Sequence, residues 1–313
     1  MGANMYTGNT SELFSLPPAN LMRLSVSWAD NDRFLARGAS AFAKVKEAFE
    51  QAGANFEGRV LEWGCGCGRI IRHVLAHGLD AHGCDINEEA ISWCKNNIGS
   101  DRFVHCSVNP LLPYEDQSFD FIYAGSVITH LSVDLQIYWI QELRRILKPG
   151  GYLLLTFAGT FHIRNYFGRD AVTIRALNDQ PFLEVGNHTE GSNEYGIAQT
   201  IGTLDIAAVG FERRNHIISH DILGAQDTAV FQKVKTEKPA SFALMTCEKF
   251  LDHPRATLFS KGKEVVRISG AIPNQLFFVQ LSEPLPDADS SQLIALQNFS
   301  LIRLVHLQPE KQN

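Results

Sequence analysis

The sequence predicts an α/β fold in which a mostly parallel sheet carries helices on both faces. From residue 59 onward, short apolar runs typical of strands alternate with runs of helical periodicity. A glycine-rich turn joins the first strand to the next helix, and 45% of the 313 residues are hydrophobic, which is enough for a large core. Because such sheets bind ligands at the carboxyl ends of their strands, we expect the functional site at that edge.

The N-terminal part, residues 1–56, is expected to form a helical cap with a helix at 40–51. The alternating core follows it. The expected strands are 59–63, 79–85, 102–106, 119–125 and 152–157, and the expected helices are 69–77, 88–97 and 132–147. Asn87 and Ser132 are of the residue types that cap helix N-termini, and 148–151 is expected to be a turn.

The chain becomes less regular after the fifth strand. Residues 158–202 are rich in glycine, asparagine, histidine and aromatic residues. We expect a loop-rich insertion there, over the strand ends, where substrate contacts are often found. A helix at 203–209 and a hairpin of strands at 211–219 and 227–234 then complete a core domain at 57–235.

The last part, residues 236–313, is predicted to be a small β-rich appendage. Its strand-like runs are 241–249, 265–269, 275–281 and 299–306. We expect a homodimer contact through this part; glycan binding and cover of the core are the alternatives.

Composition argues against several classes of protein. The net charge is −6, with no basic stripe of the kind that nucleic-acid binders carry, so no nucleic-acid partner is expected. The longest strongly apolar run, 152–158, is too short to cross a bilayer. No secretory signal is recognised, and the six cysteines do not resemble a disulfide framework, so a cytoplasmic location is expected.

Two pairs of residues have spacings that metal ligands also use. Cys65 and Cys67 flank a glycine, but a closed structural site needs four ligands and no second pair accompanies them. His73 and His77 are four residues apart without a third ligand. We therefore expect no metal, with the cysteines packed in a tight turn and the histidines on an exposed helix face.

The glycine-rich turn has the pattern Glu62-x-Gly64-x-Gly66-x-Gly68. A dinucleotide site would have G-x-G-x-x-G, but the third glycine position is Arg69. A carboxylate at position 62 would repel a pyrophosphate and would pair with an ammonium group. The turn therefore favours a cofactor with a zwitterionic amino-acid part.

Asp85 ends the second expected strand, 21 residues after Gly64. This is the usual place for a carboxylate that accepts hydrogen bonds from ribose hydroxyls. The alternative is that Asp85 caps the following helix. Ile86 is expected against one face of an adenine, although by itself it would be assigned to the core.

Four segments occur in an order that resembles the class I S-adenosylmethionine-dependent methyltransferases, over about residues 30–235. They are V-L-E-W-G-C-G-C-G-R, G-C-D-I-N, L-P-Y-E-D-Q-S-F-D-F-I-Y and E-L-R-R-I-L-K-P-G-G-Y-L-L-L-T. The resemblance implies a Rossmann-like sheet of seven strands, the last antiparallel and entering by a hairpin. It also implies S-adenosylmethionine as cofactor and S-adenosylhomocysteine as product.

The resemblance also implies roles for individual positions. Glu62, Gly64 and Gly66 would line the methionine and ribose part of the cofactor, and Asp85 would bind the ribose. The cofactor-contacting positions further along the chain would be Asn109, where the family usually has an acid near the adenine, and Gly125 and Ser126 beneath the methionine.

The acceptor side is predicted from residues that follow the fourth strand or lie in the insertion. His130 is the candidate general base, because histidine titrates near neutral pH; the alternative is local packing only. His162, His188 and Tyr195 are candidate acceptor contacts, or ordinary loop residues. Arg37 is interpreted as a surface residue, with contact to a methionine carboxylate as the alternative.

The function expected from these features is transfer of a methyl group, by in-line displacement, to an oxygen or nitrogen atom of a small molecule or sugar precursor. Three alternatives stay open. They are an NAD-dependent oxidoreductase, a non-catalytic protein that binds the adenosyl cofactor, and aminopropyl transfer from the decarboxylated cofactor.

Overall fold

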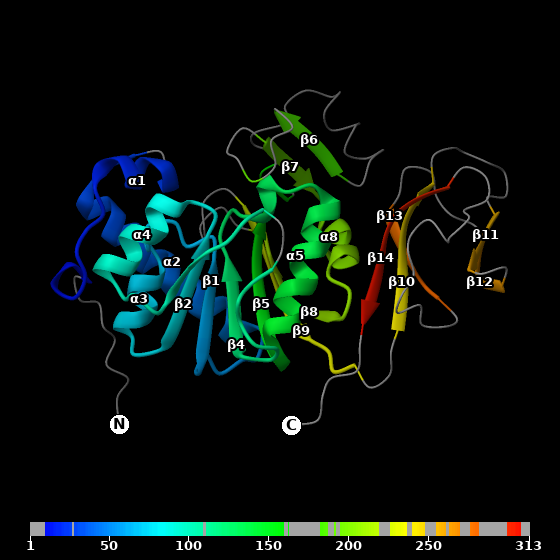
Figure 1. Ribbon diagram of the computed structural model, residues 1–313, viewed down its shortest axis with the longest axis horizontal. Helices are drawn as coiled ribbons and strands as arrows, with labels where there is room; N and C mark the ends of the chain where they lie inside the picture. Colours follow the sequence, from blue (N-terminus) through cyan, green and yellow to red (C-terminus); the bar gives the residue numbers. More distant parts are fainter. Residues whose placement is uncertain are drawn as a thin grey trace.

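The protein is described by a computed structural model at residues 10–26, 28–108, 111–159, 162, 182–186, 191, 195–218, 226–236, 240–247, 255–260, 263–269, 276–281 and 299–307. Its centre is a seven-stranded sheet of order β3-β2-β1-β4-β5-β9-β8 (Figure 1). The strands are β1 (Arg59–Trp63), β2 (Asp80–Asp85), β3 (Phe103–His105), β4 (Phe119–Ala124), β5 (Leu147–Phe157), β8 (Phe211–Ile217) and β9 (Asp227–Lys233). Only β9 is antiparallel to its neighbours, so the predicted fold class is confirmed.

Helices cover both faces of this sheet. The helices α2 (Asn31–Gln51), α3 (Ile71–Ala76) and α4 (Glu88–Asn97) pack on one face, and α5 (Val133–Ile146) and α8 (Ile201–Ala207) pack on the other. Successive strand residues point to opposite faces, so Val60 joins the first layer and Leu61 the second. Fully burying one such large aliphatic side chain contributes about 1.5–3 kcal/mol.

The N-terminal cap contains η1 (Thr10–Glu12), α1 (Ala19–Val26) and α2. Helix α2 begins nine residues before the predicted helix at 40–51, because Asp30 caps it by accepting a hydrogen bond from Arg33 N at 2.7 Å. Its first half buries Gly38, whose missing Cβ allows a close approach to α3, and such a small residue gives no apolar periodicity. The sequence pattern therefore revealed only the second half of the helix.

The insertion contains a hairpin that the sequence did not predict. Strands β6 (Phe182–Gly186) and β7 (Tyr195–Gln199) are antiparallel. Gln199 N donates to Ala158 O at 3.0 Å, and the buried Gln199 side chain donates to Gln136 Oε1 at 3.0 Å. These bonds attach the hairpin to the end of β5 and to α5. The sequence predicted a loop-rich insertion without singling out these two strands, because they lack a regular apolar alternation.

The bounds of two other elements differ from expectation. The segment expected as a turn, 148–151, lies inside β5, where the pairing with β4 is irregular between Phe119 and Phe121. Helix α8 begins at Ile201 rather than 203 because Thr200 caps it, accepting a hydrogen bond from Thr203 N at 3.2 Å.

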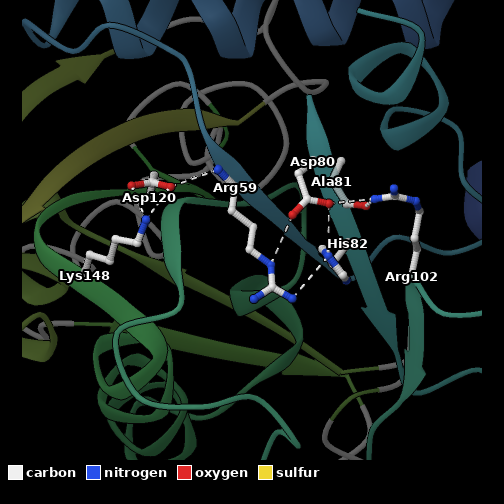
Figure 2. Close-up of polar contacts among 7 residues, drawn as sticks. All are labelled: Arg59, Asp80, Ala81, His82, Arg102, Asp120 and Lys148. Carbon is white, nitrogen blue, oxygen red and sulfur yellow. Dashed lines mark hydrogen bonds and ion pairs between the residues drawn. The ribbon is translucent and has the colours of Figure 1, made fainter. Parts of the chain in front are cut away.

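A network of ion pairs occupies the amino ends of the strands (Figure 2). Asp80, the first residue of β2, contacts Arg59 at 3.4 Å and Arg102 at 2.8 Å. Asp120 accepts two hydrogen bonds from Lys148 Nζ, at 2.8 and 2.9 Å. Both carboxylates at this edge are thus paired with cations, and the five residues link β1, β2, β4, β5 and the start of β3.

The C-terminal region contains a three-stranded antiparallel sheet of order β13-β10-β14 and a two-stranded sheet of β11 and β12. Their bounds are β10 (Ala240–Cys247), β11 (Arg255–Ser260), β12 (Lys263–Ser269), β13 (Leu276–Gln280) and β14 (Phe299–Leu307). β11 was not predicted. Figure 1 shows the larger sheet beside α8, and Leu307 is buried in the core that contains α5 and α8. The domain boundaries at 56/57 and 235/236 remain predictions.

Of the described residues, none form a helix with the length and apolarity needed to cross a membrane.

Candidate active site

A cavity of about 360 Å³ opens at the carboxyl ends of β1, β2 and β4. Its lining combines the glycine-rich turn, the ends of three strands and one glycine of the insertion. The lining residues are Glu62, Trp63, Gly64, Cys65, Gly66, Arg69, Ile70, Asp85, Ile86, Asn87, Ala90, Cys106, Val108, Gly125, Ser126, Val127, His130, Leu131, Trp139 and Gly191. The sequence predicted this edge of the sheet as the site.

The turn between β1 and α3 requires glycine. Gly64, Gly66 and Gly68 have φ values of +79°, +51° and +78°, a left-handed conformation that other residues rarely adopt. At Gly64 a Cβ would also clash with the Val127 side chain. The main chain therefore runs directly along the wall of the cavity.

The two cysteines of the turn are packed inward, as expected. Cys65 is 4% exposed and Cys67 is fully buried. Among the described residues no group of three or more histidine, cysteine or acidic side chains is arranged to hold a metal ion.

Glu62 brings a buried carboxyl group to the cavity. It is 4% exposed and accepts a hydrogen bond from the Tyr123 hydroxyl at 2.9 Å. Burial raises its pKa to about 8, against opposing effects of the Tyr123 hydrogen bond and the Arg69 charge. A ligand ammonium group would stabilise the ionised form, so this side chain fits the cofactor that the sequence suggests.

Asp85 lies across the turn from Glu62, at the end of β2. Its Oδ2 accepts a hydrogen bond from Gly66 N at 2.7 Å, and its Oδ1 accepts one from Asn87 N at 2.8 Å. Burial raises the pKa of Asp85, and these two backbone hydrogen bonds act in the opposite direction. The N-cap of α4 is Asn87, not Asp85. An ionised carboxylate has about four lone-pair sites, so Asp85 can accept a hydrogen bond from a ligand hydroxyl beside those from the backbone.

The loop after β4 forms another wall. Gly125 and Ser126 both line the cavity, as predicted for residues beneath the methionine. Ser126 has a φ of +60°, and its N–H donates to Thr156 Oγ1 at 2.8 Å. Thr156 in turn donates to Gln226 Oε1 at 2.7 Å, so β5 and the residue before β9 hold the loop in this strained conformation.

His130 lies at the end of η2 (Ile128–His130) and lines the cavity. Its carbonyl accepts a hydrogen bond at 2.8 Å from the N–H of Gly191, a residue of the insertion. Gly191 has a φ of +77°, and a Cβ there would lie 3.2 Å from Val108 and 3.3 Å from Ile86. Gly191 therefore lies beside the end of the cavity that Ile86 lines, and Ile86 itself is 42% exposed.

The remaining predicted site residues are not brought into the cavity. His162 is half-buried and does not line it. His188, Asn109 and the side chain of Tyr195 lie outside the described residues. Their roles remain predictions.

The expectation of an exposed histidine pair was wrong for His73. Its side chain is buried against Gly38 of α2, and burial, with the nearby Arg72 and Arg69 charges, lowers its pKa to about 4. His77 packs edge-on against Phe42, with ring centroids 5.4 Å apart. The sequence could not show the burial of these histidines because the residues that pack over them belong to another segment, α2.

The sequence analysis did not predict that Arg69 and Gly191 line the cavity. Arg69 was noted only as the residue that breaks the dinucleotide pattern. Gly191 had no local signal, because only the fold carries the insertion over the strand ends. Arg37 is exposed as expected, and only its carbonyl contacts the site, by accepting from Arg69 Nη1 at 3.4 Å.

Comparisons with known proteins agree with this geometry. The family described as "Methyltransferase domain" matches residues 61–155. The chain is 30% identical over 132 residues to the tRNA N(3)-cytidine methyltransferase METTL2 of Gallus gallus, covering 38% of this chain and 36% of the relative. It is 35% identical over 117 residues to the fatty-acid O-methyltransferase of Mycolicibacterium smegmatis, covering 34% and 40%.

The aligned segments span less than half the length of these curated relatives. A solved structure with a similar fold is the 1,6-didemethyltoxoflavin-N1-methyltransferase of Burkholderia thailandensis with bound S-adenosylhomocysteine. It is 17% identical, with a TM-score of 0.47, covering 70% of this chain and 92% of that chain. Residues 61–155 of the chain thus match a methyltransferase domain, in agreement with the resemblance that the sequence segments carry.

Proposed function

We propose that the protein catalyses methyl transfer from S-adenosylmethionine to an oxygen or nitrogen atom of a small molecule. The observation that carries this proposal is the pair of buried carboxyl groups, Glu62 and Asp85, in one cavity with a glycine-rich main chain. This set of groups suits a ligand with an ammonium group and a ribose diol.

The proposed roles follow from where each group lies. Glu62 binds the ammonium group of the amino-acid part, and Asp85 accepts hydrogen bonds from the ribose hydroxyls. Ile86 and Val108 provide apolar contacts at the end that Gly191 covers, which suits an adenine. When bound, S-adenosylmethionine supplies an electrophilic methyl group, and the chain contributes alignment and exclusion of water.

His130 is the proposed general base. It lines the cavity next to the loop of Gly125 and Ser126, and the Gly191 hydrogen bond fixes its main chain. A histidine in this place would accept the proton that an acceptor hydroxyl or ammonium group loses.

A small-molecule acceptor, including a sugar precursor, is supported by the net charge of −6, because binding an RNA backbone normally requires a basic surface. The fatty-acid relative modifies a small molecule, whereas the METTL2 relatives modify tRNA. Five buried free cysteines support a reducing compartment such as the cytoplasm. A homodimer through the C-terminal strands also remains part of the proposal.

The test combines binding and transfer. Calorimetry should show binding of S-adenosylhomocysteine and none of NAD. Incubation with S-adenosylmethionine carrying a labelled methyl group should label a small-molecule extract, and His130→Gln should reduce that transfer at least about tenfold without changing cofactor affinity. Labelling of a tRNA pool instead would overturn the acceptor assignment. Binding of NAD alone, or of cofactor without transfer to either pool, would overturn the function.

A further inference from the structure

The one-turn helix η2, which carries the proposed base, makes few hydrogen bonds of its own. His130 N donates to Val127 O at 3.0 Å, and Leu131 N donates to Ile128 O at 3.2 Å. A single 3₁₀ turn has poorer hydrogen-bond geometry than an α-helix and is too short to be stable by itself. The position of η2, and with it that of His130, therefore depends on the residues that hold this turn from outside.

Gln136 of helix α5 holds η2 at both ends. The side chain is fully buried, and its Nε2 donates to Ile128 O and to Leu131 O, each at 3.0 Å. One amide group thus connects the first residue of η2 with the residue that follows it. Two donors on one nitrogen are required, so a glutamate would lack them, and a methionine of similar length would remove both hydrogen bonds.

Gln199 of strand β7 links this contact to the insertion hairpin. It is 1% exposed, and its Nε2 donates to Gln136 Oε1 at 3.0 Å. Because both N–H groups of Gln136 face carbonyl oxygens, its Oε1 must face Gln199, so the orientation of both amides follows from the network. The main chain of Gln199 is itself fixed, since its N–H donates to Ala158 O, just after β5, at 3.0 Å.

Two further hydrogen bonds hold η2. Gly191, which lies between β6 and β7, donates from its N–H to His130 O at 2.8 Å. Thr129 Oγ1 donates to Ser126 O at 3.2 Å, which ties η2 to the loop after β4. The hairpin therefore reaches the main chain around His130 by two separate routes, through Gly191 and through the two buried glutamines.

We propose that Gln136 and Gln199 are positioning residues for methyl transfer, which hold η2 so that His130 reaches the acceptor. This inference rests on the proposed role of His130. Neither glutamine occurs among the described residues that line the cavity, so both act through η2. A base must lie within hydrogen-bond reach of the proton it accepts, and a small displacement slows the reaction strongly. Loss of the pair should therefore slow transfer without weakening the cofactor.

The experiment removes each hydrogen bond with little change in side-chain length. Gln136→Met and Gln199→Met are made in the wild-type chain and together with His130→Gln. The initial rate of labelled methyl transfer to the small-molecule extract is measured at saturating S-adenosylmethionine, and the affinity for S-adenosylhomocysteine is measured by calorimetry. The matched control is Gln141→Met, because Gln141 lies on the same helix and its Nε2 donates to Val209 O at 3.0 Å rather than to η2.

Gln136→Met should lower the transfer rate about fivefold to tenfold, and Gln199→Met about threefold to fivefold, since the latter leaves the two bonds to η2 in place. The affinity for S-adenosylhomocysteine should stay within about twofold of the wild type. With His130→Gln already present, either change should cost less than about twofold, because the base that they position is gone. Gln141→Met should match the wild type.

Losses of equal size with and without His130→Gln would overturn the inference, because a merely structural residue lowers the rate whether or not the base is present. The absence of any loss, or the same loss in Gln141→Met, would overturn it as well. Thermal melting shows whether each variant is folded. If Gln136→Met is not folded, Gln199→Met decides between the outcomes.

Failure of the proposed function looks different, since the wild-type chain would then transfer no methyl group to the extract. The connection between hairpin and η2 is tested even in that case by amide hydrogen exchange at His130 and Leu131. Gln136→Met and Gln199→Met should both accelerate this exchange relative to Gln141→Met, because they release η2 from outside. Unchanged exchange in both variants would contradict the connection itself.

Discussion

The two edges of the central sheet use charge in opposite ways. At the amino edge, Asp80 and Asp120 are in direct contact with arginine and lysine side chains from neighbouring strands (Figure 2). At the carboxyl edge, Glu62 and Arg69 share a cavity without such contact. The same strands therefore end in directly paired charges on one side and, on the other, in ionisable groups that form no direct ion pair with each other.

This difference separates charges that stabilise the fold from charges that serve a ligand. Partly exposed ion pairs such as those at the amino edge contribute only about 0–1 kcal/mol each, and they leave nothing for another molecule to bind. Buried groups without a counter-charge cost stability, which a ligand of complementary charge can restore. Substitutions at the two edges should therefore separate binding from stability.

The largest effect is expected from one substitution made at each end of β2. Asp85→Asn should weaken S-adenosylhomocysteine binding about a hundredfold, because it removes the proposed charged acceptor of the ribose and a partner of Gly66 N. Asp80→Asn should leave that binding within about twofold and lower the free energy of unfolding by about 1 kcal/mol. Calorimetry and urea unfolding measure the two quantities.

If Asp80→Asn weakened S-adenosylhomocysteine binding as strongly as Asp85→Asn, the proposed difference between the two edges would be contradicted. The two edges would then be coupled through β2, and Asp80 could not be assigned to stability alone.

A smaller effect is expected from pH, through Glu62. Its pKa is raised to about 8 by burial, so the ligand-free protein loses stability as pH rises from 4.5 to about 8. An ammonium ligand needs the ionised form, so S-adenosylhomocysteine should bind more tightly as pH rises from 6.5 to 8, by at most about tenfold per unit. At the amino edge, burial and the Arg59 charge lower the pKa of His82.

The control is Glu62→Gln, which should remove the pH slope when affinities are measured by calorimetry. A slope that persists in this variant would assign the titration to another group of the cavity.

The smallest effect is expected from two left-handed glycines at opposite edges. Gly191→Ala and Gly150→Ala share the strain of a positive φ, which costs about 1–2 kcal/mol. Only the methyl group at position 191 would project toward Val108 and Ile86 at the end of the cavity. Gly191→Ala should therefore weaken S-adenosylhomocysteine by about threefold to tenfold, and Gly150→Ala should not. Equal affinities of the two variants would contradict the placement of adenine at this end.

The core was predictable from the sequence because its signals are local. The alternation of strands and helices, the caps at Asn87 and Ser132, and the glycine-rich turn depend on residues close together in the chain. The same holds for Glu62 and Asp85, since each sits directly at the end of a strand. The family resemblance implied seven strands with the last one antiparallel, and the pairing of β9 with β5 and β8 confirms it.

The remainder depends on contacts between distant segments. Arg69 faces the cavity because α2 lies against it, and Gly38 provides that close approach without any apolar signature. Gly191 reaches the cavity because β7 is attached to β5 and α5 through Gln199. His73 is buried because the same helix, α2, packs against it. The apolar periodicity within one segment does not show which distant segment packs over it.

The buried cysteines allow opening of the carboxyl edge to be followed by the rate of thiol modification. All five described thiols, Cys65, Cys67, Cys84, Cys94 and Cys106, are buried in or beside the wall of the cavity. A thiol reagent can reach them only when this edge opens, so the rate of modification measures the local opening equilibrium rather than global unfolding. Any molecule that occupies the cavity would slow this reaction by mass action, whatever acceptor the enzyme uses.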